Sequence, residues 1–338
     1  MNNTGRYLYI VHLKLFGGVM AIFDFPLDKL ATYMGTNPCP IDFDVFWKDS
    51  LEEMRLIEPN IECIPAQFQT PFAECFDLYF TGVRNARLHA KLLRPKNQRE
   101  KGPALLQFHG YNGNAGDWSD KLNYVAAGFT VAALDCRGQG VSEDTGGVKG
   151  ITSPGLFIRG IDDVPKNMIM RHIMLDTAQI ADILMGFDFV KSNQLCVYGA
   201  SQGGALALAC AALEPRVAKV CAMYPFLSDY QRVWEMDLAK DAYYEITHYF
   251  RNCDPEHSRE KEIFTQLGYI DIKNMAKWIK GEVLMATALQ DRICPPSTQF
   301  AVYNRIQSKK NHILYPDYQH EWIPQIADRF YQFMLQWS

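Results

Sequence analysis

The sequence predicts an α/β fold in which a mainly parallel central sheet is flanked by helices. From residue 104 onward, short apolar runs alternate with amphipathic segments, as they do in βαβ units. Hydrophobic residues make up 48% of the chain and charged residues 21%, which is ordinary for a globular protein with a large core. A length of 338 residues suits one α/β unit with an insertion. The predicted strands are 104–108, 130–134, 194–198, 218–223, 282–289 and 312–315.

Other elements are predicted before and between these strands. Residues 43–57 have a helical pattern, and residues 76–95 contain two β-rich runs around a turn at 82–86, which predicts a hairpin. The segment 228–280 is helical and charged, with one break at Asp254-Pro255, and predicts a helical insertion before the strand 282–289. No repeat or low-complexity tract marks a linker, so residues 20–338 are expected to form a single domain.

Residues 1–19 are predicted to be an N-terminal extension. The stretch 7–23 is fairly apolar, but His12 and Lys14 interrupt it. An export signal needs an unbroken apolar run, and a membrane span needs roughly 20 apolar residues. An export signal, an additional arm and an upstream start with Met20 as the usual initiator remain alternatives for this extension. No other segment approaches the length of a membrane span, so no membrane partner is expected.

Charge and cysteine content narrow the partners and the compartment. The net charge of -4 and the pI near 6.1 provide no basic field for a phosphate backbone, so nucleic acid is not an expected partner. Nine cysteines show no disulfide or zinc spacing, which favours a reducing, cytoplasmic compartment. Four of them lie in apolar runs where a free thiol acts as a small hydrophobe: Cys136, Cys196, Cys210 and Cys221.

A candidate nucleophile lies in Gly199-Ala200-Ser201-Gln202-Gly203. This Gly-x-Ser-x-Gly motif follows the predicted strand 194–198 and precedes the Ala/Leu-rich helix 204–213, which is the strand-turn-helix context that a nucleophile elbow requires. The motif alone often marks only a tight turn. Residues two positions from the serine must be small because strand and helix nearly touch there, and Gly199 and Gly203 meet that need.

A serine hydroxyl needs a base to take its proton and a carboxylate to orient that base. In sheets with such an elbow these partners follow in the order acid, then histidine. Asp291 comes after the strand 282–289 and His320 after the last strand, so they are predicted as acid and base. A turn or helix-cap residue is the alternative for Asp291. Asp317 is a rival acid, but it lies too close to His320 in the sequence.

Two other histidines, His172 in a helix-like run and His312 at a strand start, are expected to be packed or surface residues. The oxyanion of acyl transfer needs two preorganised N–H donors. One is predicted to be the amide of Gln202, directly after the nucleophile. The other should come from the loop 109–113, with Tyr111 the best candidate; a plain glycine-rich turn is the alternative. His109 itself is expected to be structural.

With these residues placed, the chain resembles carbohydrate esterase family 7, the acetyl xylan esterase and cephalosporin C deacetylase group of the α/β-hydrolase superfamily. Three signatures appear in order: Arg137-Gly138-Gln139, the elbow 199–203 and His320-Glu321. The similarity runs from about Met20 to the C-terminus, and Asp291 with the segment 294–298 also fits. The departures are the extension 1–19 and the loop 112–118, whose length varies among members.

The resemblance implies an intracellular serine esterase that removes acetyl groups from small xylo-oligosaccharides and related compounds. It implies a hexamer, an oxyanion hole formed by the Tyr111 and Gln202 amides, and supporting roles for Arg137 and Gln139. Tyr111, Trp118 and Pro225 are candidate substrate contacts, although the aromatic residues around Pro225 also suit core packing. The reaction would pass through an acetyl-serine intermediate without a metal or an organic cofactor.

Three alternatives follow from the same elbow. A prolyl-oligopeptidase-type peptidase shares the catalytic order but needs roughly 300 further residues for its propeller. A dienelactone hydrolase needs cysteine where Ser201 stands. A binding protein on the same fold would have lost its catalytic groups, whereas all of the expected ones are recognisable here.

Overall fold

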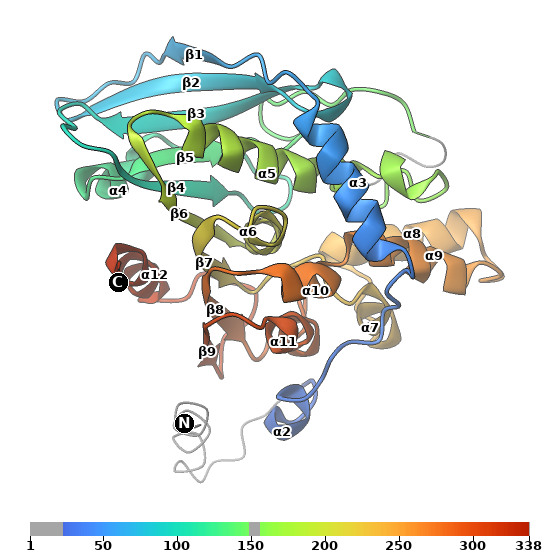
Figure 1. Ribbon diagram of the computed structural model, residues 1–338. Helices are drawn as coiled ribbons and strands as arrows, with labels where there is room; N and C mark the ends of the chain where they lie inside the picture. Colours follow the sequence, from blue (N-terminus) through green and yellow to red (C-terminus); the bar gives the residue numbers. More distant parts are fainter. Residues whose placement is uncertain (1–22, 149–155, 338) are drawn as a thin grey trace, which may run out of the picture.

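A computed structural model describes residues 23–148 and 156–337. The described residues form one nine-stranded sheet with the strand order β1-β2-β3-β5-β4-β6-β7-β8-β9 (Figure 1). The strands are β1 Glu62–Pro65, β2 Ala73–Thr81, β3 Arg87–Pro95, β4 Gly102–Phe108, β5 Thr130–Leu134, β6 Val190–Ala200, β7 Val217–Met223, β8 Glu282–Ala288 and β9 Lys310–Tyr315. From β5 to β9 all neighbours are parallel, which confirms the predicted mainly parallel sheet.

The three strands at the other edge are antiparallel. The predicted hairpin is confirmed as β2 and β3, with a one-turn 3-10 helix, η1 Val83–Asn85, at its turn. β1 was not among the predicted strands. All four of its residues are exposed, so it lacks the alternation of apolar and polar residues by which a half-buried strand is recognised.

The helices are α2 Leu27–Leu30, α3 Phe43–Arg55, α4 Leu122–Ala126, α5 Ile169–Gly186, α6 Gln202–Leu213, α7 Tyr230–Glu235, α8 Tyr244–Cys253, α9 Glu260–Leu267, α10 Ile272–Met275, α11 Pro296–Arg305 and α12 Ile326–Leu335. Further 3-10 turns are η2 Ser119–Lys121, η3 Pro165–Asn167, η4 Asp241–Tyr243, η5 Gly268–Ile270 and η6 Ala276–Trp278. The helices from α7 to α10 lie in the predicted insertion, and the break at Asp254-Pro255 separates α8 from α9.

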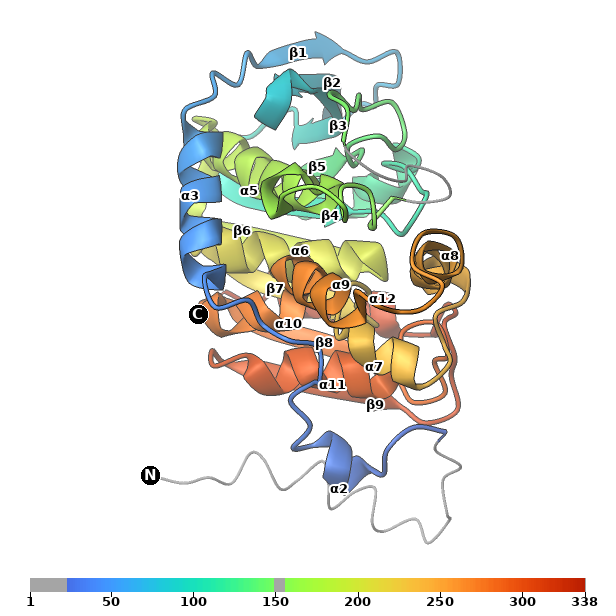
Figure 2. The same cartoon turned by 90° about the vertical axis from the view of Figure 1, so that its right-hand side faces the viewer.

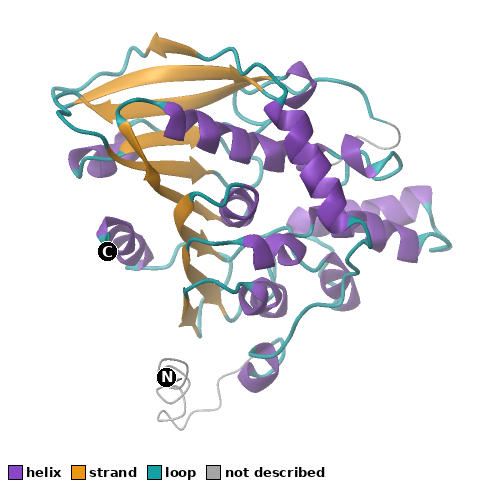
Figure 3. Cartoon of the chain, in the orientation of Figure 1, coloured by secondary structure: helices purple, strands orange, loops and turns teal. Residues whose placement is uncertain are grey.

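The helices cover both faces of the sheet, and each face has its own core. α3, α5, α6, α10 and α11 lie on one face, and α4 and α12 lie on the other (Figures 1 and 3). Trp47 of α3 and Leu206 of α6 belong to the larger apolar cluster, whereas Tyr124 of α4 and Phe330 of α12 belong to the smaller one. α6 is buried at every position, which explains its uninterrupted Ala/Leu-rich sequence.

The carboxyl ends of neighbouring parallel strands lie at one edge of the sheet. In register, Phe108 of β4 is opposite Gly199 of β6, and Ala288 of β8 is opposite Tyr315 of β9. The loops that leave these strand ends carry, in sheet order, residues 109–113, the elbow, the segment 289–295 and the segment 316–320. Candidate residues up to about 200 positions apart in sequence therefore converge, as sites of open α/β sheets do. α8 of the insertion lies beyond this edge (Figure 2).

The N-terminal part of the described chain contacts α11 and α7. Asp24 accepts a hydrogen bond from the Ser297 amide at 2.7 Å, at the start of α11, and pairs with Arg232 of α7 at 2.9 Å. The Asp24 side chain is fully buried, so this pairing is shielded from solvent. Residues 23–24 lie within the part of the chain that resembles the family. Through Asp24 they link α11 to α7. The extension 1–19 lies outside the described residues.

Candidate active site

Ser201 occupies a sharp turn between β6 and α6. Its backbone has φ 57° and ψ -121°, a conformation that side-chain-bearing residues rarely adopt and that raises local strain. The turn is held by a hydrogen bond from the Ser201 amide to the carbonyl of Met223 at 3.0 Å and by one from the Phe226 amide to the Ser201 carbonyl at 3.1 Å. The strand-turn-helix geometry expected of the motif is therefore present, with the Ser201 side chain partly exposed.

The two flanking glycines have no room for a side chain. A Cβ on Gly199 would lie 2.2 Å from the carbonyl carbon of Gly203, and a Cβ on Gly203 would lie 2.1 Å from the carbonyl oxygen of Phe108. Real Cβ atoms do not approach backbone this closely, so the turn excludes any residue but glycine at both positions.

We expect Gly203→Ala to destabilise the fold by about 3 kcal/mol, because the methyl group must push α6 away from β4. Urea unfolding of the full chain measures the change. Gly186→Ala is the matched control, since Gly186 ends α5 and nothing lies within 4 Å of its Cβ position. Equal urea midpoints for the two variants would contradict this prediction, because they would show that the structure accommodates a methyl group at position 203 with no loss of stability.

Asp291 and His320 lie in direct contact. The Nδ1 atom of His320 is 2.8 Å from Oδ2 of Asp291, and the side chains are 17% and 0% exposed. Oδ1 of Asp291 accepts the amides of Ile293 at 2.9 Å and Cys294 at 2.8 Å. Asp291 is thus both a turn residue and the partner of His320, so the two interpretations drawn from the sequence are compatible. Asp317, the rival acid, is exposed.

The histidine loop is fixed from two sides. The Gln290 amide donates to the carbonyl of Tyr318 at 3.0 Å, which joins the loops after β8 and β9. The ring of Tyr224 packs against the imidazole of His320 at 4.4 Å between centroids, and its hydroxyl donates to the carbonyl of Glu321 at 3.1 Å. These contacts restrict the imidazole, as a base that serves one hydroxyl requires.

The other histidines considered have packing roles. His172 is buried in α5, its Nε2 donates a hydrogen bond to the Lys166 carbonyl at 3.0 Å, and burial lowers its pKa to about 3. His312 packs against Tyr303 at 4.1 Å between centroids, and burial lowers its pKa to about 3. The ring of His109 accepts the Cys136 amide at 3.0 Å through Nε2, which fixes the loop after β4.

Tyr111 lies in the loop after β4, and Gln202, the first residue of α6, follows the elbow after the adjacent strand β6. The side chain of Gln139 links these two segments. Its Oε1 accepts a hydrogen bond from Gln202 Nε2 at 3.2 Å and another from the backbone amide of Asn112 at 3.0 Å. Gln139 therefore contacts the backbone next to Tyr111 and the side chain of Gln202, the two residues predicted to supply the oxyanion donors. Such preorganisation is what an oxyanion site needs.

Arg137 fixes the loop after β5, which also carries Gln139. Its guanidinium makes two hydrogen bonds of 2.7 and 2.8 Å to the carboxylate of Asp176 in α5 and one of 2.9 Å to the Val83 carbonyl. Arg137 and Asp176 are both fully buried. Removing either charge would leave the other unpaired in the core, so this pair anchors the loop that carries Gln139.

Glu245 of α8 contacts the candidate site through Tyr111 and was not predicted from the sequence. Its buried carboxylate accepts a hydrogen bond from the hydroxyl of Tyr111, and the amides of Leu156 at 2.8 Å and Ile158 at 2.9 Å. Burial raises the pKa of Glu245. No local pattern pairs two positions 134 residues apart, so only the tertiary structure shows that the insertion contacts the loop of Tyr111.

We expect Glu245→Gln to lower kcat about tenfold with a smaller change in KM, since a displaced oxyanion donor costs less than the roughly 10²–10³-fold of a lost one. An amide NH₂ in place of one carboxylate oxygen faces backbone N–H groups and disturbs the Tyr111 loop. Tyr111→Phe removes the same hydrogen bond from the other side. The two losses should therefore not add in the double variant; additive losses would assign Glu245 to another role.

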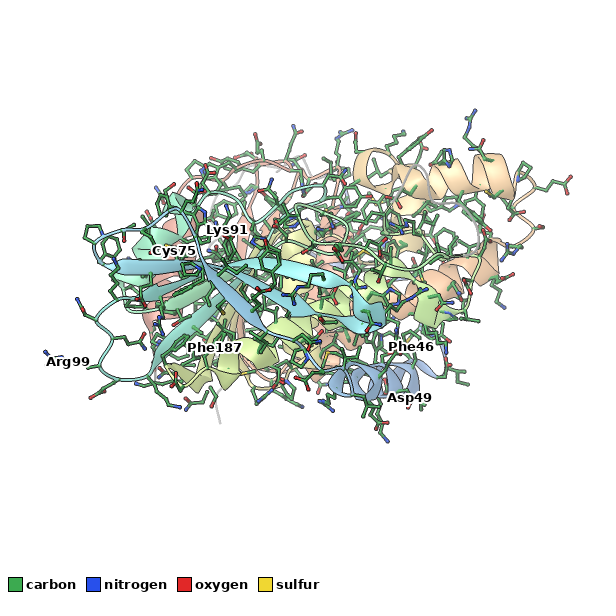
Figure 4. All side chains as sticks on the ribbon, turned by 90° about the horizontal axis from the view of Figure 1, so that it is seen from above. Phe46, Asp49, Cys75, Lys91, Arg99 and Phe187 are labelled. Atoms are coloured by element: carbon green, nitrogen blue, oxygen red, sulfur yellow. The ribbon has the colours of Figure 1, made fainter. Side chains whose placement is uncertain are left out.

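Pro225 and Trp118, the two other candidate substrate contacts, differ in where they lie. Pro225 is buried, and its neighbour Phe226 packs against Tyr111 at 5.7 Å between centroids, so this segment lies beside the predicted oxyanion loop. Trp118 stacks on Phe68, and the ammonium of Lys91 on β3, labelled in Figure 4, lies 5.0 Å from its ring centre. The contacts described for Trp118 include no residue of the predicted triad, and its substrate role stays a prediction.

All nine cysteines are free, and the four predicted in apolar runs are buried. Within residues 23–148 and 156–337, no helix has both the length and the apolar character to cross a bilayer.

Comparisons with known proteins show which family this chain resembles. The family profile described as acetyl xylan esterase (AXE1) matches residues 20–337. Acetyl xylan esterase 1 from a Thermoanaerobacterium species is 61% identical, covers 93% of this chain and 99% of its own, and superposes with a TM-score of 0.91. An acetyl xylan esterase from a Paenibacillus species is 34% identical, with coverage of 92% and 99% and a TM-score of 0.88.

A curated relative, acetyl esterase Axe7A from Xylanibacter ruminicola, is 29% identical over 299 residues, or 83% of this chain. The chain spans 63% of the length of that relative. An acylaminoacyl peptidase from Pyrococcus horikoshii, 14% identical with a TM-score of 0.56, shares only the fold. The α/β-hydrolase fold, the elbow at Ser201 and the match over residues 20–337 lead to one conclusion: the chain belongs to the acetyl xylan esterase family of carboxylic ester hydrolases.

Proposed function

We propose that this protein removes acetyl groups from acetylated xylo-oligosaccharides and related small acetyl esters, cephalosporin C among them. The observation that carries the proposal is the 2.8 Å contact between Asp291 and His320 at the sheet edge that also presents Ser201. The names of the similar proteins, acetyl xylan esterases and an acetyl esterase, support the acetyl group as the acyl part.

In the proposed reaction Ser201 Oγ attacks the acetyl carbonyl carbon while His320 Nε2 takes the hydroxyl proton. Asp291 accepts the Nδ1 hydrogen and so keeps Nε2 available as base. The amides of Tyr111 and Gln202 donate to the oxyanion of the tetrahedral intermediate. When that intermediate collapses, the C–O bond to the sugar breaks and His320 returns its proton to the departing alcohol.

The second half of the reaction repeats these steps with water. His320 takes a proton from a water molecule, whose oxygen attacks the acetyl-serine carbonyl, and the amides hold the second oxyanion. The Ser201 ester bond breaks, His320 protonates Oγ, and acetate leaves. Each proton passes through the one imidazole, so the cycle ends with the starting protonation state.

The acyl specificity is tested with p-nitrophenyl esters of increasing acyl length and with acetate release from acetylated xylo-oligosaccharides and cephalosporin C. We expect hydrolysis of the acetyl esters and a steep fall in kcat/KM for longer acyl chains. A preference for long acyl chains or for peptide amides would overturn the substrate class while leaving the triad in place.

The proposed partners are also testable. A small acetylated carbohydrate is the proposed ligand, and neither nucleic acid nor a membrane is part of the proposal. The hexamer implied by the family resemblance stays a prediction, which light scattering of the full chain would check.

A further inference from the structure

Cys294 lies beside the acid–base pair and has no part in the proposed reaction. Its sulfur, a carboxylate oxygen of Asp291 and a ring nitrogen of His320 all lie within 4.8 Å of one another. The turn after β8 produces this arrangement, because the Cys294 amide donates to Asp291 Oδ1 at 2.8 Å. The thiol is buried, and the side chain of Ser201 lies beside it.

The three donor types suit a soft divalent cation. Thiolate, imidazole and carboxylate are the groups that bind Zn²⁺ in proteins, whereas Mg²⁺ and Ca²⁺ prefer sets of oxygen ligands. Two ligand atoms on one tetrahedral zinc lie about 3.5 Å apart, because the bonds are about 2.0–2.3 Å long. The ligand atoms of the three side chains lie at most 4.8 Å apart, so side-chain shifts of about an ångström would bring them to this distance without a rearrangement of the loops.

We propose that Asp291, Cys294 and His320 form a binding site for Zn²⁺ or a similarly soft divalent cation, and that an ion bound there inhibits ester hydrolysis. Binding converts the Cys294 thiol to a thiolate and releases one proton to solvent, while Asp291 stays ionised and the imidazole stays neutral. An ion held by Asp291 and His320 displaces the hydrogen bond that orients the imidazole. His320 then no longer receives the proton of Ser201, so turnover stops.

Cys294 differs from the other buried cysteines in its neighbours. Among the described residues, Asp291, Cys294 and His320 make up the one set of three metal-ligating side chains that lie this close together. Burial raises the pKa of the Cys294 thiol, which disfavours the thiolate and hence a role as a rival nucleophile. A metal ion overcomes this burial effect, because coordination to the sulfur stabilises the thiolate directly.

The inhibition test uses the full chain and p-nitrophenyl acetate, with Zn²⁺ titrated and each variant referred to its own metal-free rate. We expect the concentration for half-inhibition to rise at least tenfold in Cys294→Ala, since loss of a supporting group alone costs 10–100-fold in metal affinity. Cys221→Ala is the matched control, because Cys221 is equally buried in β7. Mg²⁺ should not inhibit, and EDTA should restore activity.

Equal zinc sensitivity of Cys294→Ala and the wild type would overturn the proposal, as would a wild type that zinc does not inhibit. A second measurement needs no activity, so it separates this proposal from the esterase proposal. Serine replaces the three exposed cysteines, Cys39, Cys63 and Cys253, and Co²⁺ is added in the Ser201→Ala background. We expect a thiolate-to-cobalt charge-transfer band that Cys294→Ala abolishes and Cys221→Ala keeps; a band retained in Cys294→Ala would refute the site.

Discussion

Replacing Ser201 by alanine is expected to lower kcat for acetate release by about 10⁶-fold, the scale of nucleophile loss in serine hydrolases. The elbow presents this hydroxyl at the edge where Asp291 and His320 meet, so no other group of the turn can take its place. The residual rate over water would come from the oxyanion donors and binding alone. Initial rates on p-nitrophenyl acetate and on an acetylated xylo-oligosaccharide measure the loss.

A control variant and a labelling experiment test whether the loss of rate is specific to Ser201. Ser119→Ala, at an exposed serine in η2, should retain the wild-type rate. A fluorophosphonate probe should label the wild type and Ser119→Ala but not Ser201→Ala. If Ser201→Ala were labelled as well, the nucleophile would be another residue, although the fold and the family would stand.

Asp291→Asn is expected to lower kcat by about 10⁴-fold. The asparagine amide donates where the carboxylate accepts, so it favours the imidazole tautomer with its hydrogen on Nε2, and that tautomer cannot take the proton of Ser201. The loop should change less than the rate, because one side-chain oxygen still accepts the amides of Ile293 and Cys294. Steady-state kinetics together with thermal unfolding separate the two effects.

The matched control is Asp317→Asn, three residues before His320 and exposed to solvent. We expect its kcat to stay within about twofold of the wild type, since surface substitutions rarely matter beyond their own contacts. A large loss in Asp317→Asn with little loss in Asp291→Asn would exchange the roles of the two carboxylates. The 2.8 Å contact with His320 argues for the assignment to Asp291.

Much of the fold was predictable, because its central strands have a strong local signature. Strand β5 has the predicted bounds, and β6 extends the predicted 194–198 to Val190–Ala200. β5 and the segment 195–197 of β6 are buried, so each appears as a short continuous apolar run, whereas the exposed residues 191–193 at the start of β6 lack this signature. β1 was missed for the opposite reason, since its side chains are all exposed and only pairing with β2 makes it a strand.

The candidate site could be predicted from the sequence where a local motif and the order of the strands are sufficient. The elbow at Ser201 is a local feature of strand, turn and helix, and the order of acid and base along the chain follows from the order of the strands. Glu245 was not predictable, because its role depends on how α8 folds back over the loop of Tyr111.

The sequence by itself therefore determined the α/β class, the elbow and the residues that follow each strand. Only the tertiary structure decided which atoms meet: His320 Nδ1 with Asp291 Oδ2, Tyr111 with Glu245, and the Cys294 sulfur with the acid–base pair. The physical reason is that periodicity and motifs report the burial and backbone conformation of adjacent residues. Contacts between loops depend instead on which strands are neighbours and on their register, which long-range packing sets.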